Sequence, residues 1–90
     1  MNNEVLQTII EELQQIAELL YQENIQPAYA MLANVLPRIE VLISGIEDDS
    51  VRDELVEKFG AALGAMEEED NTLLADILQY EIIETLQQYI

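Results

Sequence analysis

Three carboxylates near the end of the chain are the side chains whose types and spacing come closest to doing chemistry. Asp76, Glu81 and Glu84 lie within the stretch LLADILQYEIIETL at residues 73–86. Two carboxyl groups can work as general acid and base when they share a pocket that raises the pKa of one of them. At about 100° per residue, however, Asp76 points nearly opposite to the apolar side of this predicted helix. We therefore expect no enzyme, and a carboxylate-dependent enzyme is the alternative.

Glu81 is the unusual member of this group, because helical spacing places it between Leu74 and Ile77, inside the apolar stripe. Three interpretations are open. Glu81 lies at the rim of the stripe with its head in water, or it forms an ion pair with Arg38, or it is a functional carboxylate that binds a cation or a basic side chain of a partner. Glu12 is open to the same three interpretations.

The composition excludes most other kinds of catalysis and of metal binding. The chain has no cysteine and no histidine. Disulfides, thiol or imidazole catalysis, and zinc or iron–sulfur ligation are therefore excluded. The acidic runs EEED and EDD lack the residue spacing of a calcium-binding loop. We expect neither a cofactor nor a metal.

The charge of the chain restricts its partners. Three cations stand against nineteen carboxylates, a net charge of −16, which repels nucleic acid and anionic membrane surfaces. No stretch has the ~18 apolar residues of a membrane span, and the N-terminal MNNEVLQTIIEELQQ lacks the basic and apolar regions of a signal peptide. We expect a cytoplasmic protein whose acidic surface maintains solubility or attracts a basic or amphipathic protein segment.

The 90 residues predict one domain, 1–90, built from four amphipathic helices. Short polar loops between such helices favour an all-α, antiparallel up-down-up-down four-helix bundle. Pro37 falls inside the second helix, whose apolar stripe keeps its register, so we expect a kink there and not a break. The first helix is expected near residues 3–22, the second between Asn24 and Gly45, the third from Ser50 with Asp53 as a capping box, and the fourth from Asp70 or Asn71.

Two further features point to surfaces where another helix could pack. Gly60 and Gly64 occur as GAALG, a spacing that lets a second backbone come close, as in a dimer. Otherwise each glycine is simply tolerated, at a cost of about 1 kcal/mol relative to alanine. Tyr80 is one of four tyrosines that suit the edge of a core or, alternatively, a groove that binds a peptide helix.

The stretch AMEEEDNTLLADILQYEIIETL at residues 65–86 resembles the C-terminal segment of a family of small, uncharacterised, all-helical bacterial proteins found mainly in Firmicutes. The matching pattern is of the LLADxLxYE type and includes Asp76, Tyr80 and Glu81. The resemblance implies a helical fold and a helix of interest, but no reaction. A weaker similarity, in size, acidity and the aliphatic–tyrosine pattern near the end, is to flagellin-type export chaperones, longer proteins that bind an amphipathic helix of their client.

These features predict a protein-interaction module that binds a partner protein or a second copy of itself through helix faces. Binding of an amphipathic client helix, in the manner of an export chaperone, is the alternative within this class. The candidate interaction or structural polar positions are Glu81, Arg38, Asp76, Tyr80, Gly60 and Gly64.

Overall fold

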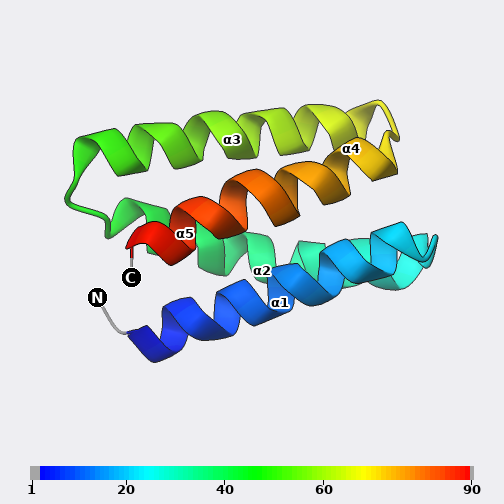
Figure 1. Cartoon of the computed structure of the whole chain (residues 1–90), viewed down its shortest axis with the longest axis horizontal. Coiled ribbons are helices and arrows are strands. Elements are labelled where there is room, and N and C mark those ends of the chain that lie inside the picture. Colours follow the sequence, from blue (N-terminus) through cyan, green and yellow to red (C-terminus); the bar gives the residue numbers. More distant parts are fainter. Residues whose placement is uncertain (1–2, 90) are drawn as a thin grey trace.

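The computed structural model describes residues 3–89, and within that range the chain forms helices and no strands. The helices α4, η1 and α5 follow one another without a loop and together make the fourth helix of the molecule (Figure 1). The expected all-α fold of four helices is confirmed. The bounds are α1 Asn3–Tyr21, α2 Ile25–Ser44, α3 Asp49–Glu67, α4 Asn71–Asp76, the π-helix η1 Ile77–Ile82, and α5 Ile83–Tyr89.

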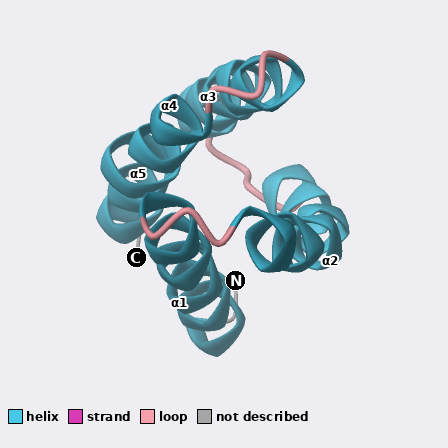
Figure 2. Ribbon diagram, turned by 90° about the vertical axis from the view of Figure 1, so that its right-hand side faces the viewer, coloured by secondary structure: helices cyan, strands magenta, loops and turns pink. Residues whose placement is uncertain are grey.

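The helices lie along the longest dimension of a molecule that measures 35 × 23 × 20 Å. Figure 1 shows the chain passing back and forth along this axis, with the start of α1 and the end of α5 on one side and the two short connections α1–α2 and α3–α4 on the other. The helix α1 packs against α2 and also against α4, η1 and α5. By contrast, α2 and α3 touch at few points, and Figure 2 shows them standing apart when the molecule is turned.

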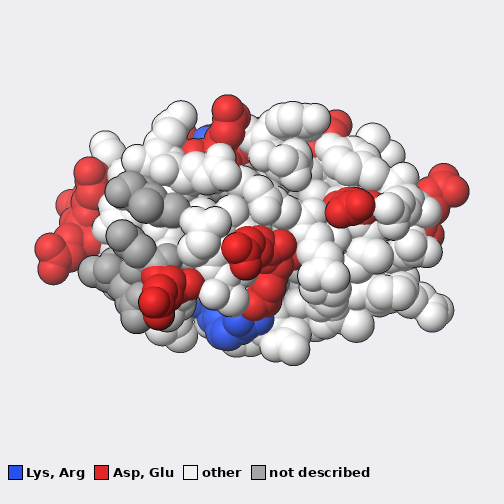
Figure 3. Space-filling model, turned by 60° about the horizontal axis from the view of Figure 1, so that its bottom comes forward, with Lys and Arg blue, Asp and Glu red and all other residues white. Residues whose placement is uncertain are grey.

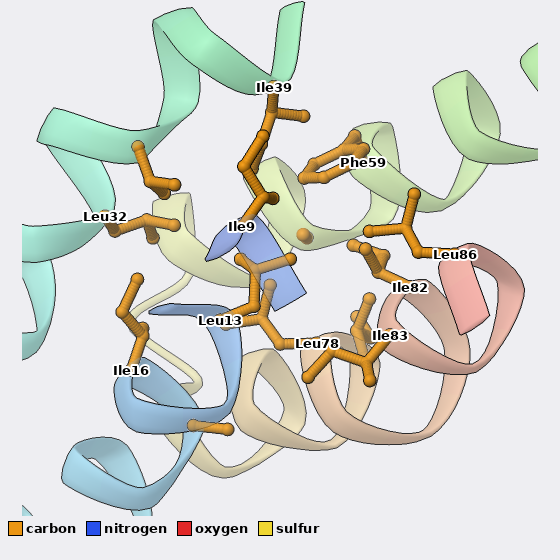
Figure 4. Packing of buried hydrophobic residues seen from close by; sticks show 14 of the residues in the cluster. Ile9, Leu13, Ile16, Leu32, Ile39, Phe59, Leu78, Ile82, Ile83 and Leu86 are labelled. Carbon is orange, nitrogen blue, oxygen red and sulfur yellow. The ribbon is translucent and has the colours of Figure 1, made fainter. Parts of the chain in front are cut away.

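The core consists almost entirely of aliphatic side chains. In Figure 4, Ile9 and Leu13 of α1 lie between residues of α2, such as Leu32, and residues of the fourth helix, such as Leu78. Thr85 is the single buried polar residue in the described part of the chain. Burying one large aliphatic side chain stabilises the fold by roughly 1.5–3 kcal/mol, so this cluster supplies the main driving force for folding.

Two glutamates occupy a backbone conformation that usually selects glycine. The φ angles are 63° for Glu23, just after α1, and 57° for Glu69, just after α3. In each case the amide of the next residue donates a hydrogen bond to the carbonyl five residues earlier. Asn24 donates to Leu19, and Asp70 donates to Ala65, both at 2.9 Å. Both ends are therefore Schellman motifs. They reverse the chain in three residues and place α2 and α4 beside the helices that precede them.

The helix caps agree with the sequence in part. Asn24 is at the N-cap position of α2, and the Asp70 carboxylate accepts a hydrogen bond from the Leu73 amide at 3.1 Å. The capping box of Ser50 with Asp53 is wrong, because α3 begins earlier, at Asp49. The preceding residue, Asp48, accepts the Ser50 amide at 3.0 Å instead, and its negative charge also suits the helix N-terminus.

The helix α2 continues from Ile25 to Ser44 with Pro37 inside it, so the proline does not break the helix. The expected kink at Pro37 stays a prediction. Gly45 follows the last residue of α2 as expected, but its φ of −87° is right-handed. This glycine therefore ends the helix without the left-handed cap that glycine usually provides there.

The π-helix η1 explains the unusual position of Glu81 in the sequence pattern. A π-helix closes hydrogen bonds between residues five apart, so each of its turns holds more residues than an α-turn. The wider turn keeps Leu74, Leu78, Ile82 and Leu86, spaced by four, on one buried face, and Glu81 is exposed. Its exposure agrees with the first of the three interpretations, a position at the rim of the stripe with its head in water.

A lysine from α3 supports the end of the π-helix. The Lys58 ammonium donates to Thr85 Oγ1 at 2.7 Å, and the Thr85 hydroxyl donates to the Glu81 carbonyl at 2.8 Å. Lys58 also pairs with Glu54 at 2.9 Å, four residues earlier on α3. Because a buried polar group without a partner is costly, this chain of bonds lets Thr85 lie in the core and ties α3 to the fourth helix.

We expect Thr85→Val to lower the free energy of unfolding by about 1–2 kcal/mol, because it removes both hydrogen bonds of a buried hydroxyl without changing its shape. The matched control is Thr8→Val. Thr8 makes the same bond to a carbonyl four residues back, at 2.8 Å, from an exposed position, so its loss should change stability by less than about 0.5 kcal/mol. Urea unfolding of both variants measures the difference. Equal losses would show that the Thr85 network does not stabilise the fold.

Candidate functional site

An apolar groove lies between α2 and α3, where the two helices stand apart. Its volume is about 540 Å³, within the range of sites that bind ligands or protein side chains. Its walls are mainly aliphatic and aromatic, with few charged or polar side chains. The lining residues are Leu36, Ile39, Glu40, Ile43 and Ser44 from α2, and Arg52, Val56, Phe59, Gly60 and Leu63 from α3.

The groove exposes apolar surface that a folded monomer would normally bury. Ile39 and Phe59 belong to the buried core and form the groove floor. Val56 and Leu63 are 57% and 48% exposed on the α3 wall. Contiguous apolar surface of this kind marks a site of interaction with another molecule more often than isolated exposed side chains do.

Of the two glycines singled out in the sequence, Gly60 lines this groove and Gly64 does not. A Cβ atom added at Gly60 or at Gly64 would meet nothing within 4 Å beyond its chain neighbours and the backbone of its own helix. Neither glycine therefore makes room for another helix within the molecule. Two explanations for the glycines stay open: they are simply tolerated in the helix, or they let a second molecule come close. Only Gly60 lies where an occupant of the groove would reach it.

Arg38 forms its ion pair with Glu12 and not with Glu81. Its guanidinium meets both carboxylate oxygens, at 2.9 Å from Nη1 to Oε1 and through Nη2 to Oε2, and so links α2 to α1. The hydrogen bond to Glu12 raises the pKa of Arg38, against a smaller opposing effect of desolvation. The Arg38–Glu81 interpretation is thus corrected: the sequence named both glutamates, but distance along the chain gave no means of choosing between them.

The carboxylates of the fourth helix are not brought together as a catalytic pair. Glu81 and Glu84 are exposed. Asp76, half-buried, accepts a hydrogen bond of 2.5 Å from the Tyr21 hydroxyl at the end of α1. Tyr80 is 62% exposed. None of these four residues lines the α2–α3 groove. The residues that carry the family resemblance in the sequence therefore lie in a different part of the molecule from the groove.

The charge of the molecule is strongly negative. The three Lys and Arg side chains are all paired internally, Arg38 with Glu12, Arg52 with Asp49, and Lys58 with Glu54. Figure 3 shows carboxylates at both ends of one face and in separate groups between broad uncharged areas. Among residues 3–89, no group of three acidic side chains has the arrangement of a metal site.

The chain belongs to the family described as Domain of unknown function (DUF8042), whose model matches residues 2–90. This agrees with the expected resemblance to an uncharacterised all-helical family. The bacterial origin and the LLADxLxYE pattern stay predictions. No curated protein and no solved structure matches the chain. In the described part of the chain, none of the helices combines the length and the apolar character needed to cross a membrane.

The contact between Tyr21 and Asp76 gives a prediction about pH. Desolvation, the hydrogen bond to Asp76 and the charge of Asp76 raise the pKa of Tyr21 from 10.0 to about 12. Because the folded state favours the neutral phenol, this contact stabilises the fold below about pH 10, and its contribution is lost as the pH rises towards 12. Asp76→Asn should lower the Tyr21 pKa, measured by NMR titration of the tyrosine ring. The control Glu84→Gln should leave it unchanged, and an unchanged pKa in Asp76→Asn would contradict this account.

Proposed function

We propose that this protein is a non-enzymatic protein-interaction module that holds an apolar helix face of a partner in the groove between α2 and α3. The observation that supports the proposal is the groove itself. An apolar hollow of about 540 Å³ runs between two helices, and an amphipathic helix laid into such a groove is a common mode of peptide recognition. The groove exposes Val56 and Leu63, which would be buried by an occupant.

The same proposal assigns no catalytic role to the carboxylates. Catalysis by a carboxyl pair would require two of them in one pocket with separated pKa values. Glu81 and Glu84 are exposed, and Asp76 is bound to Tyr21. The net charge of −16 further favours a protein partner over nucleic acid. We place this activity in the cytoplasm of a bacterium, as the composition and the family resemblance suggest.

Site-specific crosslinking in cells tests the proposal. A photoreactive phenylalanine analogue in place of Val56, on the groove wall, should give covalent protein adducts after irradiation. The same analogue in place of Ala61, which is exposed on α3 but does not line the groove, should give far fewer. An equal pattern of adducts at the two positions, or none at Val56, would contradict the proposal.

A pair of leucine substitutions supplies a matched control. Gly60→Leu fills part of the groove and should reduce adduct formation at Val56 by about tenfold or more, because an occupant would lose contact with the α3 wall. Gly64→Leu introduces the same side chain one helical turn further along, at a position outside the groove lining, and should leave adduct formation unchanged. Both sites have open space around them, so both variants should fold.

A further inference from the structure

We infer that the occupant of the α2–α3 groove is a cationic amphipathic helix, apolar on one face and carrying Lys or Arg along both edges of that face. This inference rests on the proposed function and specifies the chemistry of the partner. It follows from the shape of the groove, from the carboxylates beside it, and from the internal pairing of the three Lys and Arg side chains.

The shape of the groove suits a short helix. Its lining covers residues 36–44 of α2 and residues 52–63 of α3, about two to three helical turns at about 1.5 Å per residue. The polar groups on its walls are few, so a partner backbone lying there would have to satisfy its own hydrogen bonds, as a helix does. The apolar wall residues would then meet one apolar face of that helix.

Carboxylates lie along both sides of the groove. Glu40 lines the α2 wall, and it is the only carboxylate among the twenty residues of α2. On α3, Asp53 and Glu57 are exposed and share a strip with Gly60, since these residues are spaced by three and four. Because Gly60 lines the groove, this strip borders it. A helix in the groove would therefore have acidic side chains on both flanks.

Each Lys and Arg side chain among residues 3–89 already has an acidic partner within the molecule. Arg52 itself lines the groove, where its guanidinium pairs with the Asp49 carboxylate and donates to the Ile46 carbonyl, the latter bond at 3.1 Å. The other two cations are paired with Glu12 and Glu54. Complementary charge must come from the partner, and it would act on both the rate and the selectivity of binding.

A second copy of the chain fits this site less well. Two copies joined through the grooves would bring together two molecules of net charge −16, with Glu40 and the strip of Asp53 and Glu57 on each side facing one another. Opposed like charges in an interface are unfavourable, and the three Lys and Arg side chains already have acidic partners within their own chain. The structure thus favours a cationic partner over self-association.

Binding of designed helical peptides to the intact protein tests the inference. Three fluorescent peptides share one composition of apolar residues: one has Lys along the edges of an apolar face, one has Glu at those positions, and one has the Lys sequence scrambled to disperse the apolar face. The Lys peptide should bind at least about tenfold tighter than the Glu peptide at low salt. The difference should shrink as salt is raised. The scrambled peptide should bind at least about tenfold more weakly than the Lys peptide.

Charge variants locate the effect. Glu40→Gln and Glu57→Gln should each weaken binding of the Lys peptide about two- to fivefold. Glu84→Gln, which removes an equal charge from α5 outside the groove, should have no effect, and Gly60→Leu should abolish the tight binding. Equal affinity for the Lys and Glu peptides, no binding of either, equal binding of the scrambled peptide, or a dimer in solution that Gly60→Leu dissociates would each overturn the inference.

These outcomes are distinguishable from failure of the proposed function. If crosslinking from Val56 captures a protein while the Lys and Glu peptides bind equally, the groove is an interaction site but does not select a cationic partner. If crosslinking shows no difference between Val56 and Ala61, the groove is not an interaction site in the cell and both proposals fail.

Discussion

The packing of α1 against two separate partners determines the shape of the whole molecule. The helix α1 packs against α2 and against the fourth helix. In Figure 4, its residues Ile9 and Leu13 lie between side chains of these two neighbours. Its buried side chains are Leu6, Ile9, Ile10, Leu13, Ile16, Ala17 and Leu20. Because α2 packs mainly on α1 and α3 packs mainly on the fourth helix, α2 and α3 meet each other only weakly. The groove is the consequence.

Polar contacts complete this arrangement at its edges. The bidentate pair of Arg38 with Glu12 fixes α2 to α1, and Lys58 with Thr85 fixes α3 to the fourth helix. No equivalent ion pair or side-chain hydrogen bond joins α2 to α3 among residues 3–89. The groove between these two helices exposes Val56 and Leu63 side by side with its other apolar lining, and contiguous apolar surface of this kind is typical of an interaction site.

The four helices were predictable from the sequence because each buries one apolar stripe, and local spacing is enough to recognise such a stripe. The π-helix was not predictable in this way, because a spacing of about 100° per residue describes only an α-helix. The four-residue repeat of Leu74, Leu78, Ile82 and Leu86 was the available signal, since that spacing drifts around an α-helix and stays on one face only where a turn is wider. The start of α3 was misplaced because Asp48 and Ser50 are both good N-caps and only the structure selects one.

The groove could not be predicted from the stripes alone. Its position depends on which pairs of helices make close contact, and that is decided by long-range packing. Two local signals pointed toward it: α2 has a single carboxylate in an otherwise acidic chain, and α3 has a second apolar row of Val56, Gly60 and Leu63 beside its core stripe. The sequence did identify Gly60, but the residues singled out on the fourth helix lie elsewhere.

Methyl NMR spectroscopy during titration with a cationic amphipathic peptide tests the central claim most directly, because it reports where on the protein the peptide binds. The structure predicts shifts concentrated in the methyl groups of Ile43, Val56 and Leu63, which line the groove. Shifts centred instead on Val5 or Leu73, exposed apolar residues away from the groove, would show that the interaction surface lies elsewhere and would contradict this account.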